Sequence, residues 1–158
     1  MTTHVCRQCN ADIQPHKLGR VEGEDGEIRI TIDGLPMVEC TNGHKRFPSA
    51  DFPLKFIETM LKSDDLVVAE PAVEKGLFRK HAHCPGCGQQ LPEQSGGASA
   101  QRVRVDMPQL DPVGVELAVP LFACPGCRKE ATLPKNGVQR GVMQAVANAF
   151  RSADIPPG

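Results

Sequence analysis

The sequence predicts a small α+β protein made of two tandem units, each a short antiparallel β-sheet followed by an α-helix. A Cys-x-x-Cys pair opens each unit, at 6/9 and at 84/87. A second pair of metal-ligand residues follows, at 40/44 and at 124/127, and a segment with helical spacing comes after it. These repeats predict a first copy over 1–63, a linker over 64–77, a second copy over 78–151 and a flexible tail over 152–158.

The composition favours a fold that is stabilised by disulfides or metal ions rather than by a large apolar core. Of the 158 residues, 40% are hydrophobic but only 4% are aromatic, with no Trp or Tyr, so few large side chains can anchor a core. Two units of roughly 75 residues each are marginal without a disulfide or metal staple. Seven cysteines offer that staple.

The cysteines favour metal binding over disulfides. Their number is odd, they come in close pairs, and the opening MTTHVCRQCN carries no signal-peptide pattern. Close pairs suit joint binding of one ion better than long-range cross-links. We therefore expect a reducing, cytoplasmic location.

The formal net charge of −1 predicts no strong attraction to nucleic acid or to an anionic membrane surface. No apolar run approaches the roughly 18 residues that mark a membrane span. The favoured partner is therefore a protein, nucleic acid comes second, and no membrane is expected.

Alternating apolar and polar residues predict strands between the ligand pairs, at 27–32 in the first unit and at 101–105 and 115–119 in the second. The acidic run 22–27 and the pair Asp64-Asp65 are interpreted as solvated turns without partner groups. Nothing in the sequence supports acid–base catalysis, and we expect no enzyme activity.

The first unit is expected to end in a helix over 52–62. Asp51 is the expected cap, and Leu54, Ile57 and Leu61 share one face.

The second unit is expected to end in a helix over 137–151, capped by Asn136, although Gly141 lowers its helix propensity. Turn-forming residues mark the connection between the units, and 66–69 are expected to dock across it. The segment 93–100 (EQSGGASA) is predicted to be a flexible loop.

The ligand spacing predicts two tetrahedral zinc sites. Two cysteines separated by two residues place both thiolates on one ion through a tight turn. Seven cysteines and one histidine supply eight donors, which fill two four-coordinate shells and leave no thiol over. The predicted ligands are Cys6, Cys9, Cys40 and His44 for the first ion and Cys84, Cys87, Cys124 and Cys127 for the second.

Two alternatives stay open. His16 or His4 can replace His44 in the first site, although His44 lies within one residue of the place that Cys127 holds in the repeat. In a cross-braced arrangement, the two Cys-x-x-Cys pairs share one ion. Spacing alone does not exclude that arrangement.

Backbone and coordination chemistry agree with structural zinc. The residue after the second cysteine of such a turn commonly adopts a left-handed conformation, which Asn10 and Gly88 tolerate well. Four protein ligands leave no open position for water, which argues against catalytic zinc.

The four ligand segments and the strands between them resemble the zinc-ribbon superfamily across both units, which implies two tandem zinc ribbons. The second unit, where 120–127 (PLFACPGC) precede a helix, is also similar to the zinc-binding domain of bacterial antitoxins of the YgiT type. In that family the ribbon usually joins a DNA-binding helix-turn-helix, and this sequence shows no such module. The resemblance implies a small bacterial module that engages protein or nucleic acid.

Three functions follow, in order of preference. The first is a non-enzymatic adaptor or regulator whose ribbons present surfaces to a protein. The second is a transcriptional regulator or antitoxin-like protein that binds nucleic acid, and the third is a rubredoxin-like or dithiol redox protein. The scarcity of aromatics and of long basic stripes places the last two below the first. The basic candidates are 45–46, 79–80, Arg102, Arg104 and 128–129.

Overall fold

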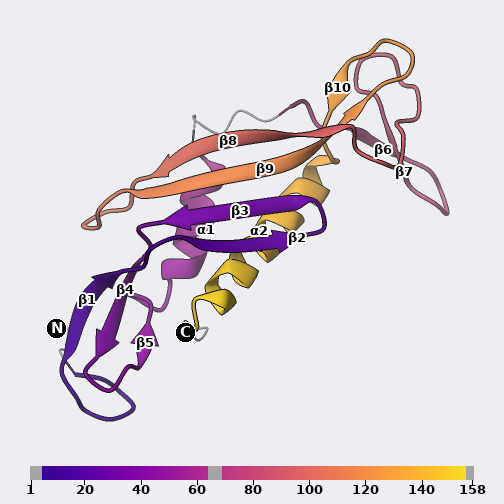
Figure 1. The fold of residues 1–158 in the computed structure, drawn as a ribbon. Helices are drawn as coiled ribbons and strands as arrows, with labels where there is room; N and C mark the ends of the chain where they lie inside the picture. Colours follow the sequence, from indigo (N-terminus) through magenta and orange to yellow (C-terminus); the bar gives the residue numbers. More distant parts are fainter. Residues whose placement is uncertain (1–4, 64–68, 156–158) are drawn as a thin grey trace.

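The computed structural model describes residues 5–63 and 69–155, and strands predominate over helices in these ranges (Figure 1). The helices are α1 (Phe52–Leu61) and α2 (Lys135–Ser152). The strands are β1 (Ile13–Lys17), β2 (Val21–Asp25), β3 (Ile28–Asp33), β4 (Pro36–Cys40), β5 (Lys45–Arg46), β6 (Val73–Lys75), β7 (His81–His83), β8 (Gly97–Val105), β9 (Val113–Ala123) and β10 (Glu130–Ala131).

The two halves of the chain share one sheet, so the prediction of two ribbons each followed by its own helix is wrong. Strand β3 pairs antiparallel with β9, from Arg29 opposite Ala118 to Asp33 opposite Gly114. Strand β2 flanks β3, and β8 flanks β9. A lone two-stranded hairpin is at best marginally stable in water, whereas joining the two hairpins makes one wide apolar face.

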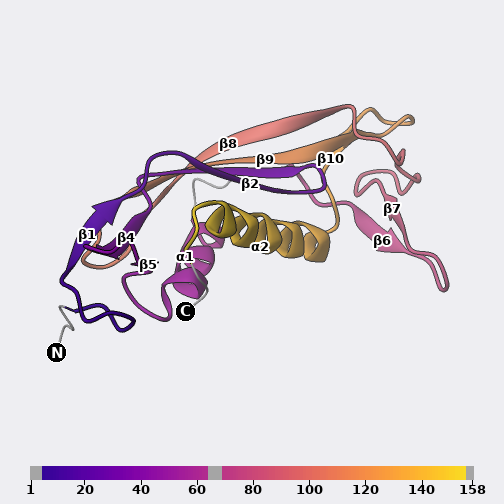
Figure 2. The same cartoon turned by 60° about the horizontal axis from the view of Figure 1, so that its bottom comes forward.

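The helices are exchanged between the halves. Helix α2, from the second half, packs against β2 and β3 of the first, and α1 packs against β8 of the second (Figure 2). Alternate residues of the central strands face this helical layer, because side chains alternate along a strand. The buried residues of this face include Ile28, Ile30, Ile32, Val113, Val115, Leu117 and Val119.

Helix α1 agrees in extent with its prediction, but its buried face differs. Phe52, Phe56 and Met60 are buried, whereas Leu54 is 56% exposed. The reason is an aromatic cluster, in which the rings of Phe56 and Phe150 lie 6.0 Å apart and so join α1 to α2.

The helix caps differ from the predictions. Asp51 makes no capping hydrogen bond and pairs instead with Lys55, at 2.8 Å between Nζ and Oδ2. Helix α2 begins at Lys135 after Pro134, so Asn136 lies inside it. The N–H groups at the start of a helix have no carbonyl partner within the helix. Proline has no N–H and therefore suits this position.

Helix α2 buries an apolar stripe, which includes Val142, Ala145, Val146, Ala149 and Phe150. Gly141 has a packing role, because a Cβ at this position would lie 2.2 Å from Cδ1 of Ile28.

The predicted strands correspond to β3, β8 and β9, with only Glu27 lying outside them, but a predicted turn and a predicted loop contain strands. Strand β2 occupies most of the acidic run 22–27, and β8 begins at Gly97, inside the predicted loop 93–100. Ladder pairing with β3 and β9 outweighs their polar composition. The segment 66–69, which was expected to dock, lies almost wholly outside the described residues. The tail predicted over 152–158 is not flexible throughout, because Ile155 is 3% exposed and belongs to the core.

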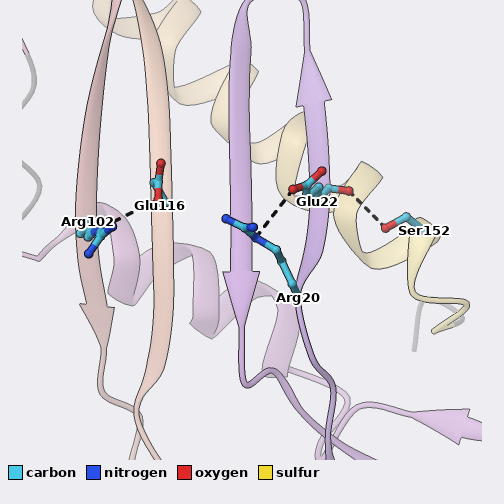
Figure 3. A network of polar contacts seen from close by, with 5 residues as sticks. All are labelled: Arg20, Glu22, Arg102, Glu116 and Ser152. Atoms are coloured by element: carbon cyan, nitrogen blue, oxygen red, sulfur yellow. Dashed lines mark hydrogen bonds and ion pairs between the residues drawn. The ribbon is translucent and has the colours of Figure 1, made fainter.

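The opposite face of the sheet is open and carries charged side chains. The Arg102 Nε lies 3.9 Å from Glu116 Oε2, and the Arg20 Nε lies 3.7 Å from Glu22 Oε1 (Figure 3). The Ser152 hydroxyl donates to the Glu22 carbonyl at 3.2 Å, so α2 also holds the edge strand β2.

The two ends of the molecule carry small accessory sheets. Strands β1, β4 and β5 form one, and the β6–β7 hairpin lies at the other end, beside β10. Because β3 and β9 are antiparallel, the chain leaves the central sheet toward Cys40 at one end and toward Cys124 at the other. In the described part of the chain, neither helix has the length and apolar character needed to cross a membrane.

Candidate metal centres

The structure gathers the eight predicted donors into two groups, whose ligand atoms lie within 4.8 Å of one another in each group. Both groups could hold a metal ion. All seven cysteines are free. We call the groups the first cluster (Cys6, Cys9, Cys40 and His44) and the second cluster (Cys84, Cys87, Cys124 and Cys127).

The turn that starts the first cluster follows from its sequence. The Asn10 N–H donates to the Cys6 carbonyl at 2.8 Å, and the Cys6 N–H donates to the Ala11 carbonyl at 2.7 Å. This closed loop turns both thiols of the Cys-x-x-Cys pair to one side. Asn10 has φ of 58°, which confirms the predicted left-handed conformation.

The second cluster uses the same turn twice. The Gly88 N–H donates to the Cys84 carbonyl at 2.9 Å, with φ of 82° at Gly88 as predicted. The Arg128 N–H donates to the Cys124 carbonyl at 2.9 Å, with φ of 64° at Arg128. Sequence reasoning missed Arg128, although the repeat itself places it where Gly88 stands.

His44 reaches the first cluster through a different turn. The Gly43 N–H donates to the Cys40 carbonyl at 3.0 Å, and the Cys40 N–H donates to the His44 carbonyl at 3.0 Å. Gly43 has φ of 86°, a conformation that glycine adopts without steric cost. One extra residue in this turn brings an imidazole to the place of the fourth thiolate.

The donor spacings match the edges of a zinc tetrahedron. With Zn–S bonds near 2.3 Å and Zn–N bonds near 2.0 Å, sulfur atoms lie about 3.8 Å apart and sulfur lies about 3.5 Å from nitrogen. The Cys9 and Cys40 sulfurs are 3.7 Å apart, and the His44 Nδ1 lies 3.6 Å from the Cys6 sulfur and 3.3 Å from the Cys40 sulfur.

The same test holds in the second cluster. The Cys84 and Cys127 sulfurs are 3.6 Å apart, and the Cys87 and Cys124 sulfurs are 3.4 Å apart. These spacings fit four thiolates around one ion. The described residues therefore present two four-donor sets of tetrahedral size.

The alternative ligands lie elsewhere or cannot be placed. His16 lies on β1 with its Nε2 3.6 Å from Glu39 Oε2, and its side chain is 55% exposed. His4 lies outside the described residues. Each Cys-x-x-Cys pair is grouped with the ligand pair that follows it, rather than with the other Cys-x-x-Cys pair. His83, beside the second cluster, places its Nδ1 3.0 Å from the His81 carbonyl.

Hydrogen bonds to sulfur favour the thiolate forms of Cys6 and Cys9 in the first cluster, whereas burial raises the pKa of Cys40. The Ala11 N–H and the Asn42 side chain lower the pKa of Cys9 to about 6. The Asn42 Nδ2 lies 3.2 Å from the Cys9 sulfur. Sequence reasoning did not single out Asn42, whose only signal was its place inside the Cys40–His44 turn. Hydrogen bonds from His44 to the Cys9 and Cys6 sulfurs raise the pKa of its imidazole.

The thiols of the second cluster differ in the same way. The pKa of Cys124 is lowered, whereas, despite a backbone hydrogen bond from Lys129, the side-chain hydrogen bond with Cys84 and burial raise the pKa of Cys127 to about 11. Hydrogen bonds from the Cys87 and Gly86 N–H groups lower the pKa of Cys84 to about 6, against the opposing effect of burial. The Gly86 nitrogen lies 3.3 Å from the Cys84 sulfur. Thiolates are the metal-binding form of cysteine, so these hydrogen bonds prepare Cys9 and Cys84 for a cation.

The open face of the sheet carries a groove, which is a weaker candidate for a binding site than the two clusters. The groove has a volume of about 970 Å³ and runs between Lys17, Arg102 and the strands β3 and β9. Lys17 pairs with Asp111 and Arg102 with Glu116, so charges of both signs line the groove.

Comparison with known proteins adds no family to these observations. No family model matches the chain, and neither the curated proteins nor the solved structures provide a match. The sequence and geometry of the two clusters therefore carry the functional argument.

Proposed function

We propose that this protein is a non-enzymatic, zinc-ribbon-related scaffold that binds two structural zinc ions and presents rigid surfaces to a partner protein. The observation that carries the proposal is the set of eight donors, held at tetrahedral spacing in two groups. Four protein ligands complete each zinc shell, and no ligand position is left for substrate or water.

The donor chemistry supports zinc over iron. Three thiolates and one imidazole form a common structural zinc set, which fits the first cluster. Four thiolates suit either zinc or iron, so the second cluster alone does not decide. Unlike iron in an electron-transfer site, zinc needs no redox partner. It would act by holding together the turns that carry its ligands. A purified protein without visible colour, with two zinc ions per chain, supports zinc.

Each zinc ion would stabilise one end of the molecule. The first cluster joins the chain before β1 to the β4–β5 turn, and the second joins the end of β7 to the β9–β10 turn. The eight donors themselves lie outside the main apolar core, although Met37 and Phe47 near the first cluster belong to it. The second cluster has only a small satellite core, which includes Ala72, Leu91 and Phe122. Metal binding would supply folding free energy that these ends lack.

The charge distribution supports a protein partner over nucleic acid. The Arg104 Nε lies 3.1 Å from Asp106 Oδ1, and Arg102 and Lys17 also face carboxylates. Paired cations of this kind form no continuous basic stripe along which a phosphate backbone could bind. A nucleic-acid-binding or antitoxin-like regulator therefore stays the second choice.

The test is affinity purification of the tagged, zinc-loaded protein from its native host, with and without chelator. We expect a specific protein that is lost when zinc is removed, and a matched loss in a Cys87→Ser/Cys127→Ser variant. An Asp106→Asn variant serves as the control that keeps both clusters. Retention of every partner after measured zinc loss would separate the clusters from function, and recovery of nucleic acid alone would favour the second choice.

A further inference from the structure

The turn between β6 and β7 exposes two adjacent bulky apolar residues. Leu77 is 95% exposed and Phe78 is 101% exposed, more than any other large hydrophobic residue in the described ranges. Exposed apolar residues that occur singly are common, but two in sequence at the tip of a projection are not explained by the core. Figure 2 shows this hairpin projecting from the end of the central sheet.

The hairpin holds these residues at its apex. Val73 pairs with His83 and Lys75 with His81, so the two strands are in register up to the turn. Gly76 has φ of 136°, and a Cβ there would lie 1.9 Å from the Arg79 carbonyl oxygen. The turn is therefore closed tightly behind Leu77 and Phe78. Their exposure follows from the backbone and not from a long loose loop.

Basic residues flank this apex along the chain. Lys75, Arg79 and Lys80 lie within the hairpin, and Glu74 is its one carboxylate, which gives the segment from Val73 to His83 a net charge of +2. Glu74 lies 3.4 Å from the Lys80 Nζ. Lys75 and Arg79 therefore flank the apolar pair on either side along the chain.

We propose that this hairpin is a membrane-docking element that inserts Leu77 and Phe78 into the surface of an anionic lipid bilayer. The arrangement matches the layers of such a surface, where acyl chains lie directly beneath negative headgroups. The apolar apex enters the acyl boundary, and the cations behind it meet the headgroups. The proposal goes beyond the scaffold function and does not depend on a protein partner.

The geometry of the hairpin favours a lipid bilayer over a protein and over single-stranded nucleic acid as its partner. A stable protein interface buries on the order of 800 Å² per partner, which two side chains on a narrow hairpin cannot provide alone. Single-stranded nucleic acid stacks on aromatic rings, which accounts for Phe78 but gives the aliphatic Leu77 no role. A fluid bilayer accepts both side chains and requires no complementary shape.

The local charge also explains why the overall net charge of −1 is a poor guide here. Screening at physiological salt confines the attraction to about 8 Å, so the headgroups respond to the hairpin rather than to the whole chain. Each basic residue near an anionic surface is expected to strengthen binding about fivefold. Burial of one such apolar side chain contributes roughly tenfold or more.

The test uses the zinc-loaded full chain with a Phe78→Trp substitution. The chain contains no Trp, so this side chain is a single fluorescent reporter at the apex. We expect its emission to shift to the blue with vesicles of equimolar phosphatidylcholine and phosphatidylserine, and not with phosphatidylcholine alone. In sedimentation with the same vesicles, Leu77→Ser should weaken binding of the otherwise unchanged protein roughly tenfold, and Arg79→Glu should abolish most of it.

Matched surface changes control for general effects. Leu54→Ser removes another exposed apolar residue, and Arg140→Glu reverses another exposed charge, so both should bind vesicles as the unchanged chain does. Equal zinc content and thermal midpoints across the variants show that folding is unaffected. No blue shift with anionic vesicles overturns the proposal, as does a response to single-stranded DNA alone. Equal weakening by Leu54→Ser and Leu77→Ser would also contradict it.

Discussion

The backbone of Gly23 in β2 lies directly against Ala149 in α2. A Cβ on Gly23 would fall 2.4 Å from the Ala149 nitrogen and 2.1 Å from the Ala145 carbonyl oxygen. No side chain fits between this strand and this helix. The contact joins residues that are far apart in the chain, so it reports directly on how the two halves are packed.

A Gly23→Ala substitution should therefore destabilise the protein. Overpacking of this kind typically costs about 1 to 3 kcal/mol, and here the neighbouring atoms belong to backbone. Urea denaturation of the zinc-loaded protein measures the change. Gly19→Ala is the matched control, because nothing lies within 4 Å of its Cβ position, and it should change stability by less than about 0.5 kcal/mol. Equal stability of the two variants would contradict the strand–helix contact.

The shared sheet predicts that the halves do not fold separately. A fragment of 1–63 lacks α2 and β9, which cover and pair with its β3. This fragment and the complementary fragment from residue 64 onward, each made alone with zinc, should both lack the dispersed amide spectrum of a packed β-sheet. An equimolar mixture of the two should recover that spectrum. Two fragments that each give dispersed spectra and retain one zinc ion would restore the picture of independent ribbons.

The turns of the second cluster predict opposite effects for two substitutions. Arg128 and Gly88 both have positive φ, at 64° and 82°. A non-glycine residue in this conformation costs roughly 1 kcal/mol, so Arg128→Gly should stabilise the zinc-loaded protein and Gly88→Ala should destabilise it by a similar amount. Thermal unfolding at saturating zinc measures both. A loss of stability in Arg128→Gly comparable with that in Gly88→Ala would argue against the repeated turn.

Acid should release zinc, and Asn42 should set where release begins in the first cluster. The folded pKa of Cys9 is about 6, below the roughly 8.5 of an unfolded cysteine. The stabilisation of its thiolate is therefore complete above that higher value and is lost as the pH falls through about 6. Below this pH, protons compete with zinc for sulfur.

A chromogenic chelator can follow this release as the pH is lowered. The unchanged protein should lose zinc only below about pH 6, because bound metal holds the thiolates further against protonation. Asn42→Ala removes the bond to Cys9 and should move release from the first cluster to higher pH, whereas Thr41→Ala should not. An identical profile for both variants would show that the Asn42 contact has no influence on metal binding.

The local turns could be predicted from the sequence, because their chemistry is confined to a few neighbouring residues. Asn10 and Gly88 identify left-handed positions, and the spacing of the repeat places His44 beside three cysteines. The central strands could also be located from alternation. What the sequence concealed was their partners, since a repeat suggests that each unit completes its own sheet.

The pairing of β3 with β9 depends on summed burial and not on any local motif. Ile30 and Leu117 are opposite one another in this pair and both are buried, but either could have faced a partner in its own half. The acidic strand β2 was missed for a similar reason. Its composition is that of a turn, and the ladder to β3 together with the contacts with α2, that of Gly23 among them, makes it a strand.

Each chain is expected to bind two zinc ions, the first of them through His44. Native mass spectrometry of the purified protein, under limited chelator, counts the bound ions directly. We predict two zinc ions for the unchanged chain, for His16→Ala and for His44→Cys, and one for His44→Ala. Two retained ions in His44→Ala, or fewer than two zinc ions in the unchanged chain after reconstitution, would contradict the account.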